Sequence, residues 1–313
     1  MQKVMPSIVI FCALFLAGCS KEIVPDKSVT VDAKGAIIME AASGRILFEK
    51  NAKEKYPPAS TAKVMTAIVA IERLPLEEVI IPSKKSLYVE PTIAGLKAGV
   101  EYRLKDLILA ILIKSANDAA GVIAEAVAGS EVEFAKVMNE KAEELGMVNT
   151  YFVKASGLPT GKVDKQHTTA EDLAIMMRYA AQYEIILEGV SRKESSIQGS
   201  DGRTIYLKTH NKALLWNEDS PWGKTGYTKE ARRTFVGVDP SYKPRIVFAL
   251  LKSTALWDDI NTLNKCGLRI YQMNHKTFIS SLVEWIENAR KSGREAFERL
   301  KPVKDIQPAP DAR

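Results

Sequence analysis

Residues 57–67 read PPASTAKVMTA, and this stretch decides the fold and the chemistry expected of it. The two prolines stop the segment before them, and Ser60 then opens a helical pattern that runs to Leu74. Positions i and i+3 share one face of a helix, so the amine of Lys63 can reach the hydroxyl of Ser60. A serine needs a base to become a nucleophile, and a lysine can be that base only if burial and a second cation lower its pKa.

A second motif, Ser115-Ala116-Asn117, follows a helical pattern of apolar residues from Leu104 to Leu112. A buried helix of this kind would hold the loop after it in a fixed position at a cleft. From there Ser115 can relay a proton towards a leaving group, and Asn117 can bond a substrate amide and Lys63.

A third motif, Lys224-Thr225-Gly226, falls in a strand pattern that follows Pro221. Lys224 can supply the second cation that lowers the pKa of Lys63. Thr225 can bond a substrate carboxylate, and Gly226 lets another backbone lie close because it has no side chain.

Each motif alone has a plainer explanation. Ser60 can be a helix cap beside a surface lysine. Residues 115–117 can form a capped turn between helices, and residues 224–226 can form a turn that contains glycine. All three motifs occur once, in the order S-x-x-K, S-x-N and K-T-G, and each falls in the context that the chemistry needs. Their joint occurrence favours a serine acyl-transfer site over three coincidences, because class A β-lactamases and penicillin-binding proteins share this trio.

Strand patterns open and close the main part of the chain, and helical patterns fill its middle. Residues 35–41 and 45–49 form a predicted hairpin, two strands flank residues 201–202, three follow Pro221, and a helix is expected over residues 257–271. This order predicts an α+β fold, in which a mainly antiparallel sheet joins the first two strands to the last three around a helical insert. The other helical patterns cover residues 104–112, 118–128, 132–145 and 169–182.

The first residues have the pattern of an export signal. Lys3 precedes an apolar run from Val4 to Leu16, which is shorter than the about 20 residues that a membrane-spanning helix needs. The run ends Leu16-Ala17-Gly18-Cys19, which resembles the bacterial lipobox. We therefore expect cleavage before Cys19 and two acyl chains on that residue, enough for a stable membrane anchor. An ordinary secretory signal with an incidental cysteine is the alternative.

These patterns predict four segments. A lipoprotein signal peptide covers residues 1–18, a tether 19–34, a catalytic domain 35–273, and an amphipathic helix with a disordered tail 274–313. The helix is expected to pack on the domain, with a position on the membrane surface as the alternative.

The composition indicates which classes of binding partner and cofactor the chain can have. The net charge of +6 fits solubility or an anionic partner, and the lack of a basic run with interleaved aromatics argues against nucleic acid. Two of the three cysteines lie in the first twenty residues, so no internal disulfide is expected in the mature chain. The three histidines fall in no metal-binding motif, and we expect neither a metal nor another cofactor.

Taken together, the motifs and their surroundings resemble the low-molecular-weight penicillin-binding proteins, which are serine D-Ala-D-Ala carboxypeptidases of the peptidase S11 type. The likeness runs from about Gly35 to Tyr271. It is carried by PPASTAKVMTA, AGLKAGVEYRLKDLILAILIKSANDAA, LGMVNTYFVKASGLP, HTTAEDLA and THNKALLW…GKTGYT. The resemblance implies a β-lactamase/transpeptidase-like fold, with a five-stranded antiparallel sheet, helices on both of its faces, a helical subdomain, and a site between them.

The resemblance also implies the roles of the site residues. Ser60 would be the acyl-ester nucleophile, Lys63 its base and Ser115 a proton-transfer group, with Asn117, Lys224, Thr225 and Gly226 at the substrate. The backbone N–H groups of Ser60 and Tyr227 would form the oxyanion hole, worth ~3 kcal/mol per donor. The implied substrates are peptidoglycan stem peptides, which would lose their terminal D-Ala, and β-lactams would be covalent inhibitors. The enzyme would be exported, anchored to a membrane, and face the periplasm or the cell exterior.

Three features depart from the family's pattern. Where the family usually has Ala-Gly after K-T-G, this chain has Ala231-Arg232. We expect Arg232 to contact the substrate carboxylate from the strand beside residues 224–226, or else to point to solvent or obstruct the groove. In the latter cases Thr225, Arg233 or Lys252 would bind the carboxylate. Some members carry an arginine for this carboxylate after the last strand, but here that loop offers only Lys252. Many members have a C-terminal β-rich domain, for which too little chain follows Tyr271, so the lipid on Cys19 would supply the anchor.

Other functions fit part of the pattern. A class A β-lactamase shares the trio, but its ExxLN pattern is absent. A D,D-endopeptidase that cuts peptidoglycan crosslinks would use the same residues on a longer substrate and is the closest alternative. A catalytically inactive peptidoglycan-binding lipoprotein is disfavoured because all catalytic positions are intact. No G-x-S-x-G elbow supports a Ser-His-Asp hydrolase.

Overall fold

The computed structural model describes residues 29–159, 166–216, 220–239 and 246–270, together with residues 272, 283, 286–288 and 290. The predicted signal peptide, Cys19 and most of the predicted tail lie outside these residues. The chain divides into two units, Met1–Gly267 and Leu268–Arg313, and the sheet and the site belong to the first. Within the described part, no helix is both long and apolar enough to span a membrane.

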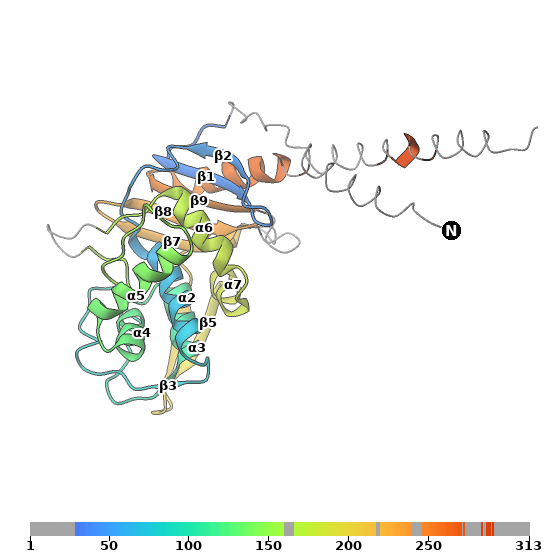
Figure 1. Cartoon of the computed structure of the whole chain (residues 1–313). Coiled ribbons are helices and arrows are strands. Elements are labelled where there is room, and N and C mark those ends of the chain that lie inside the picture. Colours follow the sequence, from blue (N-terminus) through green and yellow to red (C-terminus); the bar gives the residue numbers. More distant parts are fainter. Residues whose placement is uncertain are drawn as a thin grey trace, which may run out of the picture. The chain divides into compact units, whose positions relative to one another are not determined.

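A five-stranded antiparallel sheet forms the frame of the first unit (Figure 1). Its strand order is β2-β1-β9-β8-β7, so the first two strands join the last three, and this prediction is confirmed. β1 pairs with β9 along its whole length, from Gly35 opposite Leu251 to Glu40 opposite Ile246. The strands are β1 (Gly35–Glu40), β2 (Ile46–Lys50), β7 (Trp222–Thr228), β8 (Arg232–Val238) and β9 (Ile246–Ser253).

Helices cover both faces of the sheet, as expected. Side chains alternate between the faces of a strand, so Ile37 and Ile38 point to opposite sides. On the side of Ile37, helix α6 (Ala170–Ala180) packs across β1, β8 and β9 (Figure 1). On the side of Ile38, Gly267 of the helical segment 256–270 approaches Ile38 and Ile246. The core therefore continues on both sides of the sheet, which keeps the strands in register.

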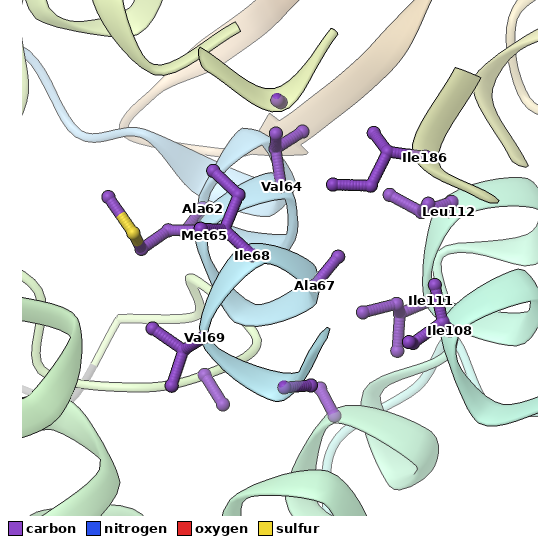
Figure 2. Packing of buried hydrophobic residues seen from close by; sticks show 14 of the residues in the cluster. Ala62, Val64, Met65, Ala67, Ile68, Val69, Ile108, Ile111, Leu112 and Ile186 are labelled. Atoms are coloured by element: carbon purple, nitrogen blue, oxygen red, sulfur yellow. The ribbon is translucent and has the colours of Figure 1, made fainter. Parts of the chain in front are cut away.

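A group of helices extends from the sheet and forms the helical subdomain (Figure 1). Its centre is α2 (Lys63–Arg73), whose residues from Lys63 to Ala70 are all buried. Figure 2 shows Val64 and Ala67 of α2 lying across from Leu112 and Ile111, with Ile186 beside them. The other helices are α3 (Leu104–Leu109), the π-helical turn η2 (Ala110–Lys114), α4 (Asn117–Ala128), α5 (Glu131–Glu144) and α7 (Glu184–Ser191).

Short elements complete the unit. The two strands predicted around residues 201–202 are present as β5 (Glu194–Gln198) and β6 (Thr204–Lys208). The sequence analysis missed α7, a short and largely apolar helix in which Gly189 lies against Leu112. It also missed the small pair β3 (Val79–Ile80) and β4 (Tyr102–Arg103) and the 3-10 turn η3 (Lys212–Leu215).

A close backbone contact fixes the start of α2. Before this helix, residues Ala59–Ala62 form a 3-10 turn, η1. Gly157 lies against the turn with a φ of 75°, and a Cβ built on it would lie 1.9 Å from the carbonyl oxygen of Ala59. Nearby, the hydroxyl of Thr66 donates a hydrogen bond of 2.7 Å to the carbonyl of Ala155. Glycine is therefore needed at position 157 both for its backbone angle and for the close approach.

We predict that Gly157→Ala destabilises the fold far more than a matched glycine substitution. Gly129, with a φ of 74°, has nothing within 4 Å of its built Cβ, so Gly129→Ala adds only backbone strain, about 1–2 kcal/mol. Gly157→Ala adds an overlap with backbone atoms, and we expect it to lower the free energy of unfolding by a further ~2 kcal/mol or more. Urea unfolding of both variants measures the difference. Equal losses would show that the turn moves freely away from residue 157.

Candidate active site

The three sequence motifs come together at one cavity of about 650 Å³. Ser60 reaches it from η1, Ser115 from the end of η2, and Thr225 and Gly226 from β7. β7 is the edge strand of the sheet, so one of its sides carries no further strand. The cavity therefore lies between the sheet and the helical subdomain, where the resemblance placed it.

The amine of Lys63 is fully buried and makes three close contacts. Its Nζ lies 2.9 Å from Ser60 Oγ, 2.7 Å from Asn117 Oδ1 and 2.8 Å from the carbonyl oxygen of Ser156. The last two partners can only accept hydrogen bonds. In the neutral amine the two N–H bonds go to these oxygens, and the lone pair is left for the hydroxyl of Ser60. The geometry is thus suited to removing the proton of Ser60.

Burial and a neighbouring cation favour the neutral form of this amine. Burial lowers the pKa of Lys63 well below its usual value, and the charge of Lys224 lowers it further. Asp118 and Glu131 oppose the shift, because negative charge favours the protonated amine. A base with a depressed pKa is what a lysine-activated serine requires.

Lys224 is the second buried lysine, and it contacts Ser115. Its Nζ donates a hydrogen bond of 2.9 Å to Ser115 Oγ and one of 2.8 Å to the carbonyl of Thr225. Burial lowers the pKa of Lys224 to about 7. Ser115 itself has a φ of 62°, in the left-handed region, where it ends η2 and begins the loop to α4. A serine held this way can pass a proton between the cavity and the lysine amines.

Asn117 and Asp118 fix the loop that forms one wall of the cavity. Asn117 Nδ2 donates to the carbonyl of Glu90 at 2.8 Å, which orients its amide so that Oδ1 faces Lys63. The carboxylate of Asp118 accepts hydrogen bonds from the backbone N–H groups of residues 94, 95 and 96. Asn117 therefore contacts Lys63, and Asp118, which follows the motif, fixes the neighbouring backbone of residues 94–96.

Gly226 brings the edge strand against the turn that carries Ser60. A Cβ built on Gly226 would lie 2.8 Å from the backbone nitrogen of Ser60. In the adjacent strand, the hydroxyl of Thr234 donates a hydrogen bond of 3.0 Å to the carbonyl of Pro58. The close approach predicted for Gly226 is therefore present, and Tyr227 follows it at the lining of the cavity.

The structure places the three candidate carboxylate cations differently from the expectation. Arg232 is the exposed first residue of β8, with a φ of 55°, and does not line the cavity. Lys252 is exposed, and its Nζ lies 5.7 Å from the ring centre of Tyr56. Arg233, one residue further along β8, does line the cavity. The contact expected from Arg232 stays a prediction, and of the two arginines it is Arg233 that lines the cavity, because adjacent residues of a strand face opposite sides.

Several residues of the site carried no role in the sequence analysis. The carbonyl of Ser156 is one, since a backbone oxygen leaves no signal in the residue type. Thr209, His210, Lys212 and Trp257 also line the cavity. Burial lowers the pKa of His210, and the nearby lysines Lys224, Lys114 and Lys63 lower it further, which favours the neutral imidazole. Among the described residues, no three His, Cys, Asp or Glu side chains gather in a way that could hold a metal ion.

Comparisons with known proteins match this arrangement. The sequence model of the D-alanyl-D-alanine carboxypeptidase family, Peptidase_S11, matches residues 21–253. D-alanyl-D-alanine carboxypeptidase DacB2 of Mycobacterium tuberculosis is 31% identical over 79% of this chain and 84% of its own length. DacF of Bacillus subtilis, a D-alanyl-D-alanine carboxypeptidase, is 33% identical over 64% of this chain, but the match spans only about half, 52%, of that protein.

Other relatives and solved structures complete the comparison. A protein named D-alanyl-D-alanine endopeptidase, from Pseudomonas aeruginosa, is 30% identical over 64% of this chain and 65% of its own length. The crystal structure of D-alanyl-D-alanine carboxypeptidase from Mycobacterium tuberculosis H37Rv superposes with a TM-score of 0.72 at 28% identity, covering 79% of this chain and 96% of that one. With its sheet, its helices on both faces and its three motifs, the chain belongs to the D-alanyl-D-alanine carboxypeptidase family of peptidases, Peptidase_S11.

Proposed function

We propose that the protein is a serine D-Ala-D-Ala carboxypeptidase, which removes the terminal D-Ala from peptidoglycan stem peptides through an acyl-enzyme on Ser60. One observation carries the proposal: the buried Nζ of Lys63 lies 2.9 Å from Ser60 Oγ and within 2.8 Å of two oxygens that can only accept hydrogen bonds. Membership of the family supports the substrate class.

Acylation would begin at this pair. Lys63 takes the proton of Ser60 as Oγ attacks the carbonyl carbon of the penultimate D-Ala. The backbone N–H groups of Ser60 and Tyr227 would stabilise the negative oxygen that forms, a contribution of ~3 kcal/mol per donor. The close approach of Gly226 to the backbone of Ser60 supports this assignment, because it brings the two segments together.

Release of D-Ala needs a proton on the leaving amine. Ser115 lines the cavity, and Lys224 holds its hydroxyl at 2.9 Å. We propose that Ser115 passes the proton taken by Lys63 to the leaving amine. Water then hydrolyses the acyl-ester, with Lys63 again as the base, and restores Ser60. Asn117 and Thr225 would hold the peptide, the first by its amide and the second at the carboxylate.

We expect a β-lactam to acylate Ser60, because its lactam amide stands in for the scissile peptide bond. Intact-mass spectrometry should show one adduct, and digestion should map it to the peptide that carries Ser60. Ser60→Ala should lose both the adduct and the release of D-Ala from a pentapeptide. Ser43→Ala, in the exposed turn between β1 and β2, is the control and should retain both. An adduct that survives Ser60→Ala would contradict the assignment.

The same preparation separates carboxypeptidase from endopeptidase activity. Incubation with a D-Ala-D-Ala pentapeptide should release free D-Ala, whereas a crosslinked peptide dimer should stay largely intact. Faster cleavage of the dimer would assign the site to crosslink hydrolysis.

The two lysines should have separable effects on the acylation rate. Lys63→Ala and Lys63→Arg should each slow acylation by a β-lactam by about 10²–10⁴-fold, because neither offers a neutral amine and a guanidinium does not deprotonate in proteins. Acylation is lost as the pH falls through the pKa of Lys63. Loss of the positive charge in Lys224→Gln raises that pKa. The acidic limb of the curve of acylation rate against pH should therefore move to higher pH.

Lys224→Arg is the matched variant because it keeps the charge. Its acid limb should stay near that of the unmodified protein. The pH dependence of the second-order acylation rate measures both variants. Slower acylation in Lys224→Gln without a shift of the limb would show that Lys224 acts through its size.

For the N-terminal segment we propose a signal peptide over residues 1–18, a lipid anchor on Cys19 and a tether that leads to the catalytic domain. The exported protein would then face the cell wall. With Cys19 intact, the protein should fractionate with membranes and incorporate labelled fatty acid, and Cys19→Ala should prevent both. Cys12→Ala, in the same segment, should change neither. Membrane retention of Cys19→Ala without label would indicate a different anchor.

A further inference from the structure

A second cavity, of about 190 Å³, lies in the helical subdomain next to the active site. Its lining comes from three parts of the chain: residues 85–89, α4 and the start of α5. Val89 lines this cavity and Pro91 lines the catalytic one, with only Glu90 between them. Two residue steps span at most about 7 Å, so the two cavities meet neighbouring points of one segment.

This segment is held in place from both sides. Asn117 donates two hydrogen bonds to it, from Nδ2 to the carbonyl of Glu90 at 2.8 Å and from its backbone N–H to the carbonyl of Thr92 at 2.7 Å. On the side of the second cavity, a Cβ built on Gly121 would lie 2.6 Å from the carbonyl oxygen of Ser86. The two cavities therefore keep a fixed relation, and a substrate bound in the catalytic one lies close to the other.

The carboxylate of Glu131, in the lining of the second cavity, is partly buried and unpaired. Among the described residues it forms no hydrogen bond and no ion pair. Burial raises the pKa of Glu131, while the charges of Lys154 and Lys63 lower it, so this carboxylate lies within electrostatic reach of the catalytic amine. A carboxylate that burial destabilises is stabilised by a cation placed beside it.

The rest of the lining also suits a cation. Tyr88 is 94% exposed, and the face of a tyrosine ring attracts an ammonium group. Glu125 accepts a hydrogen bond of 2.8 Å from Ser83 at one carboxylate oxygen, which leaves the other oxygen for a ligand. Lys85 is the single cation of this lining, so the carboxylates outnumber it. The volume is below the about 300–1,000 Å³ of pockets for whole small molecules, and it fits the end of one side chain.

We propose that this second cavity binds the side-chain ammonium of the residue that precedes D-Ala-D-Ala in the stem peptide. This inference rests on the proposed function. A stem that can be crosslinked must carry such an amine, because the crosslink is an amide formed on it. The residue before the attacked D-Ala lies at the catalytic cavity, and an amine on a stem of four carbons, as in lysine, can cover the short step from Pro91 to Val89. The enzyme would thus prefer stems whose amine is still free.

The test compares two D-Ala-D-Ala pentapeptides that differ only at this amine, which is free in one and acetylated in the other. Acetylation removes the charge and leaves the scissile bond unchanged. The unmodified protein should show a kcat/KM about tenfold higher for the free amine, the difference expected for a charge-assisted hydrogen bond. Glu131→Gln should lower kcat/KM for the free amine to near the value for the acetylated peptide, whose turnover should barely change.

Tyr88 and Glu133 supply the matched variants. Tyr88→Ala should reduce the preference for the free amine by a factor of about two to five, the range for an exposed contact between a cation and a ring, whereas Tyr88→Phe keeps the ring and should retain it. Glu133→Gln is the control. Glu133 lies in the same first turn of α5, but it is exposed, pairs with Lys136 and does not line the cavity. Its loss should leave the preference unchanged.

Equal turnover of the two peptides by the unmodified protein would overturn the inference. A Glu131→Gln variant that loses turnover of both peptides equally would overturn it too, since this loss indicates a structural role. Labelling of Ser60 by a β-lactam without an amine separates the inference from the proposed function, because Glu131→Gln should label at the unmodified rate. If Ser60 is not labelled and neither peptide releases D-Ala, the proposed function itself fails. Binding of both peptides to Ser60→Ala then still tests the cavity, and equal affinities would overturn its role.

Discussion

The structure depends on burying two lysine amines in one site, those of Lys63 and Lys224. Burial of an unpaired ammonium costs several kcal/mol, so such groups tend to lose their charge. Here the pKa of Lys63 is lowered well below its usual value by burial and by Lys224, while the pKa of Lys224 is lowered to about 7 by burial. Because each amine keeps fixed hydrogen-bond partners, the cost of burial is partly offset and the geometry is held.

The need to hold Ser60 beside the buried amine of Lys63 explains why two glycines contact the turn that carries Ser60. The turn that carries Ser60 is enclosed by two backbone segments, one at Gly157 and one at Gly226, and neither contact leaves room for a Cβ. Close backbone packing on both sides limits the movement of the Ser60 hydroxyl relative to the amine of Lys63. At the same time β7 remains an edge strand, whose outer backbone groups have no neighbouring strand. An open edge of this kind can pair with an extended peptide, so the side of the strand that the sheet leaves unpaired is the side that a substrate needs.

Much of this arrangement could be predicted from the sequence, and the limits have physical reasons. The hairpin of β1 and β2, the helix after Ser60 and a sheet that joins the first two strands to the last three follow from hydrophobic period and turn residues, and all are confirmed. α7 could not be predicted in the same way, because a short apolar run fits a strand, a helix or a buried loop and is settled only by packing against Leu112. The choice between Arg232 and Arg233 depends on strand register. A shift of one residue in the register of β8 would exchange the faces on which the two side chains lie. Because both residues are arginines, the sequence does not show which of them faces the cavity.

The electrostatics of the site combine opposing demands in one short segment. Asp118 directly follows Asn117, and its carboxylate holds the backbone of residues 94–96 in the cavity wall. The same negative charge favours the protonated form of Lys63 and so works against its role as a base. Four backbone N–H groups, those of residues 94–96 and 119, donate to this carboxylate, which weakens its field at the lysine relative to a bare carboxylate. Lys224 then supplies the positive charge that, with burial, outweighs it. The site can therefore use a carboxylate to build its wall and still favour the neutral form of Lys63, provided that both lysines stay buried.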